Sequence, residues 1–403
     1  MAKTGKHRWE FKARFRRHAF GWKSQPAITR VKQAVAEIRK VARKEPLVAA
    51  EGAVTFLERV SAALENIDSS SGAIGTAVNN AIAELVPIIA SAPADGKTRE
   101  AWLERLFEAH ANDQMPYIER LADHWGELCA SKELASAWAD RLVDVTRMAI
   151  GPDKDLRGHF HGTSACLSAL FSAGRFDEVV ELLRGNAIWP YKRWAVMAMA
   201  AAGRKAEALR YAESCRSPWA DDSDVDSICE EILLSSGMVE DAYSRYGLRA
   251  NRGGTYLATF RAVERKYPHK PAAEILADLV AMAPGDEGKW FAAAKDAGLY
   301  DEALALARRT PCDPRTLTRA ARDYAEKNPA FAVGSGLLAL YWLVAGYGYD
   351  ITGADVWAAY RSTIAAAERH GSSAEVKERI RALVASEATA DRFVSKMLAS
   401  ELR

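Results

Sequence analysis

The feature that most constrains this chain is a helix–turn–helix junction that recurs along its second half. One copy is the stretch Ala297-Gly298-Leu299-Tyr300-Asp301-Glu302-Ala303-Leu304. Gly298 follows an apolar helical segment, and glycine adopts the left-handed conformation that ends a helix at little steric cost. Asp301 and Glu302 then fall in the first turn of the next helix, where carboxylates oppose the positive end of the helix dipole. The stretch therefore predicts two helices joined by a tight turn.

The same pattern recurs at Gly174, Gly203 and Gly237. These glycines and Gly298 are separated by 29, 34 and 61 residues, and the last interval is close to two periods. Asn328 lies one further step along the chain, 30 residues after Gly298. Paired helices that repeat at such a period are typical of α-solenoids. We therefore predict an all-α fold, an α-solenoid of antiparallel, tetratricopeptide-like helix pairs with a basic N-terminal arm.

The regular pattern covers only part of the chain, so we predict four parts. These are a basic arm over 1–26, an irregular helical domain over 27–150, tetratricopeptide-like repeats over 151–345 and C-terminal capping helices over 346–403. Gly151-Pro152-Asp153-Lys154-Asp155 is the candidate hinge between the halves. Ser372-Ser373-Ala374-Glu375 fits a capping box at the start of a late helix.

Charge is distributed very unevenly. Residues 1–44 carry 14 Lys or Arg and 2 Asp or Glu, whereas the whole chain has a formal net charge of only +2. From Ala27 to Lys44 the apolar side chains share one helical stripe, and the basic side chains lie opposite it. Aromatic residues such as Trp9, Phe15 and Trp22 are interleaved with the basic ones before this helix.

Clustered cations beside aromatic rings suit the phosphates and bases of nucleic acids. The alternative is a solvated basic face that meets an acidic protein surface. The candidate DNA or RNA backbone contacts are Arg14, Arg16, Arg17, Lys23, Arg39, Lys40, Arg43 and Lys44. We refer to these eight residues as the cationic set.

Several classes of protein are disfavoured by the composition. The chain has no run of eighteen apolar residues and no N-terminal apolar signal core, so we expect no membrane span and a cytoplasmic location. The five cysteines are scattered and include no Cys-x-x-Cys pair, which argues against a disulfide framework or a zinc ribbon. We predict no cofactor.

Local motifs for catalysis or metal binding are weak. His159-Phe160-His161 is the only local histidine pair, and no carboxylate follows it at ligand spacing, so we interpret it as a polar helix start and predict no metal site. Asp221–Asp226 resembles the opening of a calcium loop, but counted from Asp222 the sixth position is Ser227 instead of glycine and the twelfth is Leu233 instead of glutamate. Gly285–Trp290 lacks the spacing of a phosphate-binding loop. An active site assembled from distant residues remains open.

The loop Gly346-Tyr347-Gly348-Tyr349 places two tyrosines near the C-terminal helices. We predict Tyr347 and Tyr349 as candidate contacts to a protein partner. The alternative is an aromatic core that joins the last repeat to its cap.

The segments Asp296–Leu304 and Gly174–Val179 resemble the Gly-x-Tyr/Phe-x-Glu-Ala core of tetratricopeptide repeats. Further segments, Arg14–Trp22, Thr310–Pro314 and Gly346–Tyr349 among them, resemble an uncharacterised family of bacterial tetratricopeptide-like helical-repeat proteins. This resemblance implies the helical-repeat fold and supplies no catalytic residues.

We therefore predict a non-enzymatic α-solenoid scaffold that binds a protein or another macromolecule. The alternative is a nucleic-acid-binding helical-repeat protein that uses the basic N-terminal segment. A third hypothesis is a helical-repeat enzyme that acts on nucleic acid, with Glu10, Trp9 and Trp22 beside the basic surface.

Overall fold

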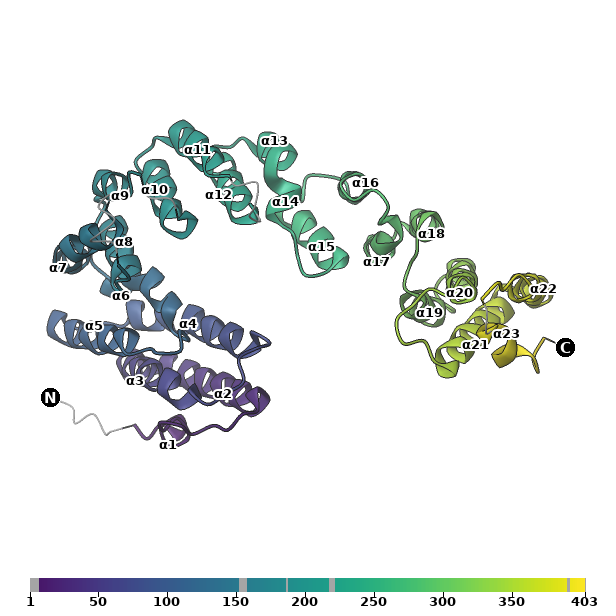
Figure 1. Ribbon diagram of the computed structural model, residues 1–403, viewed down its shortest axis with the longest axis horizontal. Coiled ribbons are helices and arrows are strands. Elements are labelled where there is room, and N and C mark those ends of the chain that lie inside the picture. Colours follow the sequence, from purple (N-terminus) through teal and green to yellow (C-terminus); the bar gives the residue numbers. More distant parts are fainter. Residues whose placement is uncertain (1–6, 152–157, 186–187, 217–221, 390–391, 403) are drawn as a thin grey trace. The chain divides into compact units, whose positions relative to one another are not determined.

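The computed structural model describes residues 7–151, 158–185, 188–216, 222–389 and 392–402 (Figure 1). Every regular element among these residues is a helix, and no strand occurs among them, so the predicted all-α class is confirmed. The chain divides into two compact units, residues 1–218 and 219–403. Each unit is described by itself.

Unit 1 consists of helices that pack mainly on neighbours close to them in the sequence. Its helices are α1 (Glu10–Arg14), α2 (Ser24–Ala42), α3 (Pro46–Leu64), α4 (Ala73–Ser91), α5 (Gly96–Ala111), η1 (Glu119–His124), α6 (Trp125–Cys129), α7 (Lys132–Ile150), α8 (Thr163–Ser172), α9 (Phe176–Leu182), α10 (Trp189–Ala201) and α11 (Lys205–Ser214).

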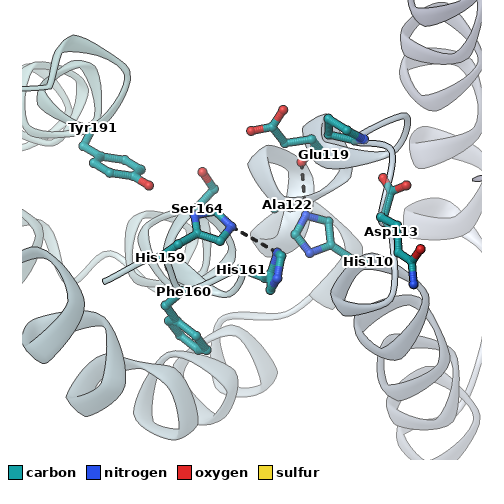
Figure 2. A pocket seen from close by; sticks show the side chains of 11 residues that line it. His110, Asp113, Glu119, Ala122, His159, Phe160, His161, Ser164 and Tyr191 are labelled. Atoms are coloured by element: carbon teal, nitrogen blue, oxygen red, sulfur yellow. Dashed lines mark hydrogen bonds between the residues drawn. The ribbon is translucent and has the colours of Figure 1, made fainter. Parts of the chain in front are cut away.

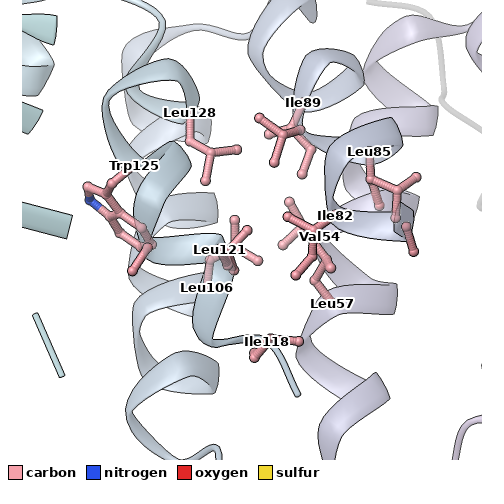
Figure 3. Packing of buried hydrophobic residues seen from close by; sticks show 14 of the residues in the cluster. Val54, Leu57, Ile82, Leu85, Ile89, Leu106, Ile118, Leu121, Trp125 and Leu128 are labelled. Atoms are coloured by element: carbon pink, nitrogen blue, oxygen red, sulfur yellow. The ribbon is translucent and has the colours of Figure 1, made fainter. Parts of the chain in front are cut away.

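Part of the unit 1 core lies where α3, α4, α5, η1 and α6 meet. Figure 3 shows aliphatic side chains of these helices pointing toward one another around Leu121. Leu57, Leu85, Leu106 and Trp125 are completely shielded from solvent. Burial of such side chains stabilises the fold by about 1.5–3 kcal/mol each. The apolar faces of these amphipathic helices are therefore buried within the unit.

The described N-terminal residues pack on this core. Trp9, Phe11 and Phe15 are buried, and the rings of Phe11 and Phe15 both contact Phe56 of α3 at centroid distances of 5.7 and 5.0 Å. The carboxylate of Glu37 in α2 accepts hydrogen bonds from the first two backbone amides of α1. Three of the aromatic residues interleaved with the basic ones thus fill the core.

Unit 2 also consists of helices, which range from 3 to 18 residues in length. Its helices are α12 (Ser223–Leu234), α13 (Val239–Ala242), the π-helical turn η2 (Tyr243–Gly247), α14 (Leu248–Ala250), α15 (Tyr256–Lys266), α16 (Ala272–Ala281), η3 (Glu287–Trp290), α17 (Phe291–Asp296), α18 (Tyr300–Arg309), α19 (Pro314–Asp323), α20 (Pro329–Val344), α21 (Gly353–His370), α22 (Ser373–Ala385) and α23 (Phe393–Leu398).

The predicted helix–turn–helix junctions are confirmed at Gly174, Gly203, Gly237 and Gly298. Each glycine has a positive φ, between 74° and 81°. In each case the amide of the following residue donates a hydrogen bond to the carbonyl five residues before it, and the Leu299 to Ala294 bond measures 2.9 Å. This is the Schellman arrangement, which satisfies the last carbonyls of a helix while the chain reverses. The same hydrogen-bonded turn therefore ends a helix at all four glycines.

Two local predictions were wrong. The predicted capping box at Ser372 is absent, because the Ser372 hydroxyl contacts Nδ1 of His370 and does not cap α22. The capping box lies instead at the start of α21, where Thr352 and Asp355 bond to each other's backbone amides. The apolar pattern from Pro116 to Ala130 also predicts a single helix, whereas this stretch forms the 3-10 turn η1 followed by the short helix α6.

One described helix, α4, is long and apolar enough to cross a membrane by length and composition alone. Its side chains Ile74, Val78, Ile82 and Leu85 are buried, and it packs on α2 and α3. A buried core helix meets the same criterion, and the expected absence of a membrane span stays a prediction.

The predicted four-part division also stays a prediction. Most of the candidate hinge, from residue 152 to 155, lies outside the described residues. The part of the cluster Asp221–Asp226 that is described, from Asp222 on, lies at the start of α12. Asp224 and Asp226 fall in the first turn of that helix, where carboxylates oppose the positive end of the helix dipole.

The contact between Trp9 and Gly52 generates a testable prediction. A Cβ at Gly52 would collide with the Trp9 ring, so Gly52→Ala forces the N-terminal segment away from α3. We expect a loss of about 1–3 kcal/mol in the free energy of unfolding, measured by urea titration with circular dichroism. Gly75→Ala in α4 is the matched control, because no heavy atom lies within 4 Å of its added Cβ. Equal stability of the two variants would contradict the packing described here.

Candidate functional site

The cationic set lies on the surface of unit 1. All eight of its side chains are exposed, whereas Ile28, Val31 and Ile38 of α2 face the core. The sequence-based prediction of one packed and one cationic face on this helix is confirmed. No contact to nucleic acid is tested by this placement, so the role of the set stays a prediction.

Three members of the cationic set take part in ion pairs. Arg14 bonds to Glu10, Arg17 lies 3.9 Å from Glu65, and Arg39 lies 2.8 Å from Glu84. Exposed pairs of this kind contribute roughly 0–1 kcal/mol to stability. The other five members make no ion pair with any described residue: Arg16, Lys23, Lys40, Arg43 and Lys44. These five cations are available to an external anion.

Of the aromatic residues near the cationic set, Trp22 is the one with a widely accessible ring. Its exposed fraction is 72%, whereas Trp9 and Phe15 are buried. Trp22 is next to Lys23 in the sequence, and its carbonyl accepts the amide of Asp68. The Trp22 ring can therefore stack on a base, whereas the two buried rings cannot.

The two tyrosines predicted as partner contacts behave differently. Tyr349 is 85% exposed, whereas Tyr347 lies 6.0 Å from the Trp342 ring and is 38% exposed. Trp342 donates its indole N–H to the carbonyl of Ala307, which holds it between α18 and α20. The loop therefore places Tyr347 against Trp342 of α20 and leaves Tyr349 projecting.

A pocket of about 320 Å³ in unit 1 collects histidines that are distant in the sequence (Figure 2). His110 comes from the last turn of α5, and His159 and His161 come from the segment that precedes α8. Glu119 of η1 and Tyr191 of α10 complete two of its sides. We call this feature the histidine pocket.

Local contacts fix the segment that carries His159 and His161. The amide of Gly158 donates to the carbonyl of Ala149 in α7, and the amide of Thr163 donates to the carbonyl of Phe160. The Phe160 ring packs directly on Gly162, where a side chain would collide with it. The two histidines on either side of Phe160 are exposed.

His110 is the buried histidine of the pocket. Its exposed fraction is 6%, and its Nε2 lies 3.3 Å from the carbonyl oxygen of Glu119. A carbonyl accepts only, so the Nε2 atom carries the proton and Nδ1 keeps a lone pair. Burial lowers the pKa of His110 below its ordinary value, since the charged imidazolium loses solvation.

The exposed histidines face each other and His110. Nε2 of His159 lies 3.2 Å from Nδ1 of His161. A dashed line marks this contact in Figure 2. The ring centroids of His159 and His161 are 4.5 Å apart, and those of His110 and His161 are 6.2 Å apart. Three imidazoles therefore converge on one cavity.

Three further ionisable groups at or near the pocket are Asp113, Tyr191 and Cys166. The Asp113 carboxylate accepts the amide of Ile118 and the hydroxyl of Ser61. Burial raises the pKa of Tyr191, and it raises the pKa of the Cys166 thiol to about 11. Among the residues described here, no group of three or more His, Cys, Asp or Glu side chains could hold a metal ion.

A second polar cluster is enclosed in unit 2. The fully buried carboxylate of Glu230 in α12 accepts hydrogen bonds from Tyr267, Asn251 and Lys266, at 2.5, 2.7 and 2.5 Å. Burial and the Glu230 carboxylate raise the pKa of Tyr267. Such a saturated arrangement suits a structural role, because a buried charge is tolerated when its hydrogen bonds are complete.

Sequence reasoning missed both His110 and the Glu230 cluster. His110 has no histidine or cysteine at ligand spacing near it, and its proximity to His161 follows only from the packing of η1 and α6 on α8. Glu230 lies on the buried face of the amphipathic helix α12. A charged residue at a position where the helical pattern expects an apolar one was the sequence signal that could have identified it.

No family of known proteins, no curated protein and no solved structure matches this chain. The resemblance to tetratricopeptide-like proteins therefore stays a prediction.

The burial of His110 predicts a pH-dependent stability. Its pKa is lower in the folded chain than in the unfolded chain, so the unfolded state binds more protons as the pH falls below about 6.5. We expect this one group to remove up to about 1.4 kcal/mol of unfolding free energy per pH unit in that range. His110→Gln should lose this component in urea titrations at several pH values in chelator-treated buffer. The control is His370→Gln, which changes an exposed histidine and should retain the pH-dependent component. Identical pH profiles of stability for His110→Gln and the wild type would contradict the attribution of this component to His110.

Proposed function

We propose that this protein is a non-enzymatic α-solenoid scaffold that binds a protein or another macromolecular partner. Recurring glycine junctions and packing between helices close in sequence support stacked antiparallel pairs. A tetratricopeptide-like arrangement and a cytoplasmic location belong to the same proposal. Solenoids bind partners along extended surfaces, so no enclosed active site is needed.

The observation that carries the proposal is a series of cavities at successive joints of unit 2. One cavity of about 650 Å³ lies between α15, α16 and η3, and a second of about 560 Å³ lies between α16 and α18. A third, of about 400 Å³, is formed by α18, α20 and α22. Repeated hollows of this kind suit a partner that contacts several helix pairs in turn.

The third cavity combines apolar and cationic groups. Leu337 and Leu338 of α20 line it together with Tyr341, which is 45% exposed. Arg308 and Arg379 are exposed on its sides. Aromatic and arginine side chains beside apolar surface are the residues most enriched at protein interfaces. We call this feature the α18–α20–α22 groove.

Charge reversal in this groove tests the proposal. We expect Arg308→Glu, Tyr341→Ala and Arg379→Glu together to weaken the complex with a partner recovered by affinity purification at least about tenfold, which is about 1.4 kcal/mol. Binding is measured by calorimetry with the purified partner. The control combines Lys377→Glu and Lys396→Glu, two exposed lysines outside the groove. Equal loss in both variants would reject the groove, and turnover by the purified chain in a pooled substrate screen would reject the non-enzymatic assignment.

The second candidate function is nucleic-acid binding through the cationic set. The five exposed cations without an ion pair among described residues favour it, because phosphates release counterions when they meet Lys and Arg. The projecting Trp22 ring supplies a surface for base stacking.

Salt dependence tests this second candidate. We expect the logarithm of the binding constant for a labelled duplex to fall linearly with the logarithm of the salt concentration. Neutralising Arg16, Lys40, Arg43 and Lys44 to Gln should reduce the slope by up to about 3.6, since each phosphate contact contributes about 0.9. The control neutralises four exposed cations elsewhere: Lys97, Arg120, Lys327 and Lys377. Absence of binding at low salt would remove this candidate.

A further inference from the structure

We propose that the cavity of about 650 Å³ between α15, α16 and η3 binds a small organic acid, with its carboxylate on Arg252 and its apolar or aromatic body against the cavity wall. We call this feature the Arg252 cavity. It lies wholly within unit 2, and its volume falls in the range of about 300–1,000 Å³ that small-molecule sites occupy. The proposal goes beyond the scaffold function and is tested without a protein partner, so either proposal can fail while the other holds.

Arg252 gives the cavity its charge. Its side chain is exposed at the wall and forms no ion pair with any residue in the described part of the chain. Asp286 is the other charged residue of the wall, and both of its carboxylate oxygens have partners. The Tyr256 hydroxyl donates to one oxygen at 2.6 Å, and the Lys289 ammonium lies 2.9 Å from the other. The charge left without a partner at the cavity is therefore positive.

Apolar side chains form much of the remaining wall. Leu279 of α16 is buried, whereas Met282, directly after α16, is 46% exposed. The rings of Tyr256 and Trp290 meet edge to face beside them, with centroids 4.8 Å apart. A ligand body that covers Met282 removes apolar surface from water, which is favourable.

Hydrogen bonds hold the segment that carries Arg252. The amide of Arg252 donates to the carbonyl of Arg249 at 3.2 Å, and the amide of Gly253 donates to the hydroxyl of Thr259 in α15 at 2.9 Å. A Cβ at Gly253 would lie 2.9 Å from the Cβ of Ala258, so glycine lets this segment approach α15 closely. The Arg252 backbone is therefore placed before a ligand binds, which lowers the entropic cost of binding.

Trp290 adds a hydrogen-bond donor that the protein does not use. Its side chain is buried in the wall, and its indole N–H has no hydrogen-bond partner among the described residues. A buried donor without a partner is unfavourable, and an acceptor atom of the ligand that reaches this N–H removes that cost. The indole N–H is therefore also a local reporter of binding.

Together these features select the class of ligand. A neutral apolar molecule leaves the Arg252 guanidinium without a partner, and a cation is repelled by it. A small hydrophilic anion leaves Met282 in contact with water. A carboxylate on an apolar body satisfies both, because a guanidinium binds a carboxylate through two parallel N–H donors.

The test titrates the full-length chain with naphthylacetate and, separately, with its neutral amide, naphthylacetamide. We expect the acid to bind at least about tenfold more tightly than the amide by calorimetry. Arg252→Gln should weaken binding of the acid at least about tenfold and leave the affinity for the amide unchanged. The matched control is Arg265→Gln, which changes an exposed arginine near the other end of α15, outside the cavity.

Two further measurements locate the ligand. Met282→Gln should weaken binding of the acid and the amide alike, because both place the same ring system on this side chain. The indole N–H resonance of Trp290, assigned by its loss in Trp290→Phe, should shift during titration of the wild type with naphthylacetate.

Three outcomes would overturn the proposal. These are no saturable binding of naphthylacetate, equal affinity for the acid and the amide, and binding to Arg252→Gln that matches the wild type. An acetylated tripeptide with a free C-terminal tryptophan supplies the same chemistry from a chain end. Tighter binding of this peptide than of naphthylacetate would assign the cavity to a peptide terminus and reject a small organic acid.

Discussion

The hydrogen bond that closes each glycine turn is the interaction on which the rest of the structure depends. A short helix gains little stability alone, so it must end cleanly and present its apolar stripe to the next helix at once. At Gly203 the amide of Arg204 reaches the Met199 carbonyl, and at Gly298 the amide of Leu299 reaches Ala294, with distances of 2.9 Å in both cases. Only a residue that tolerates positive φ permits this reversal without strain. The turn therefore sets both the length of each helix and the direction of the next.

The short helix at the N-terminus is stabilised in a different way, by tertiary contacts instead of a glycine turn. Helix α1 has five residues and cannot persist by itself, so its order comes from tertiary contacts. Glu37 satisfies its first amides, while Phe11 and Phe15 pack on Phe56. The positive charges between these rings then point outward because the rings point inward. Tertiary contacts therefore hold the backbone of the described N-terminal residues, and the charges lie on its outer side.

The sequence predicts the fold where the determinants are local, and it fails where they are not. Gly174 and Gly298 are predictable because a left-handed turn and a following acidic first turn are encoded within a few residues. The stripe of Ile28, Val31 and Ile38 is predictable for the same reason, since helical periodicity is a local property. Ser372 misled the prediction because its hydroxyl had a competing partner in His370. The histidine pocket could not be predicted, because His110 and His161 meet only through the packing of intervening helices.

This distinction also bears on how the pocket relates to stability. Helices that pack on close sequence neighbours open locally, each joint with its own free energy. The histidine pocket joins the last turn of α5 to the segment before α8, and α6, α7 and α8 pack between and around these points. Local opening of α5 or of the 158–162 segment therefore also opens the pocket.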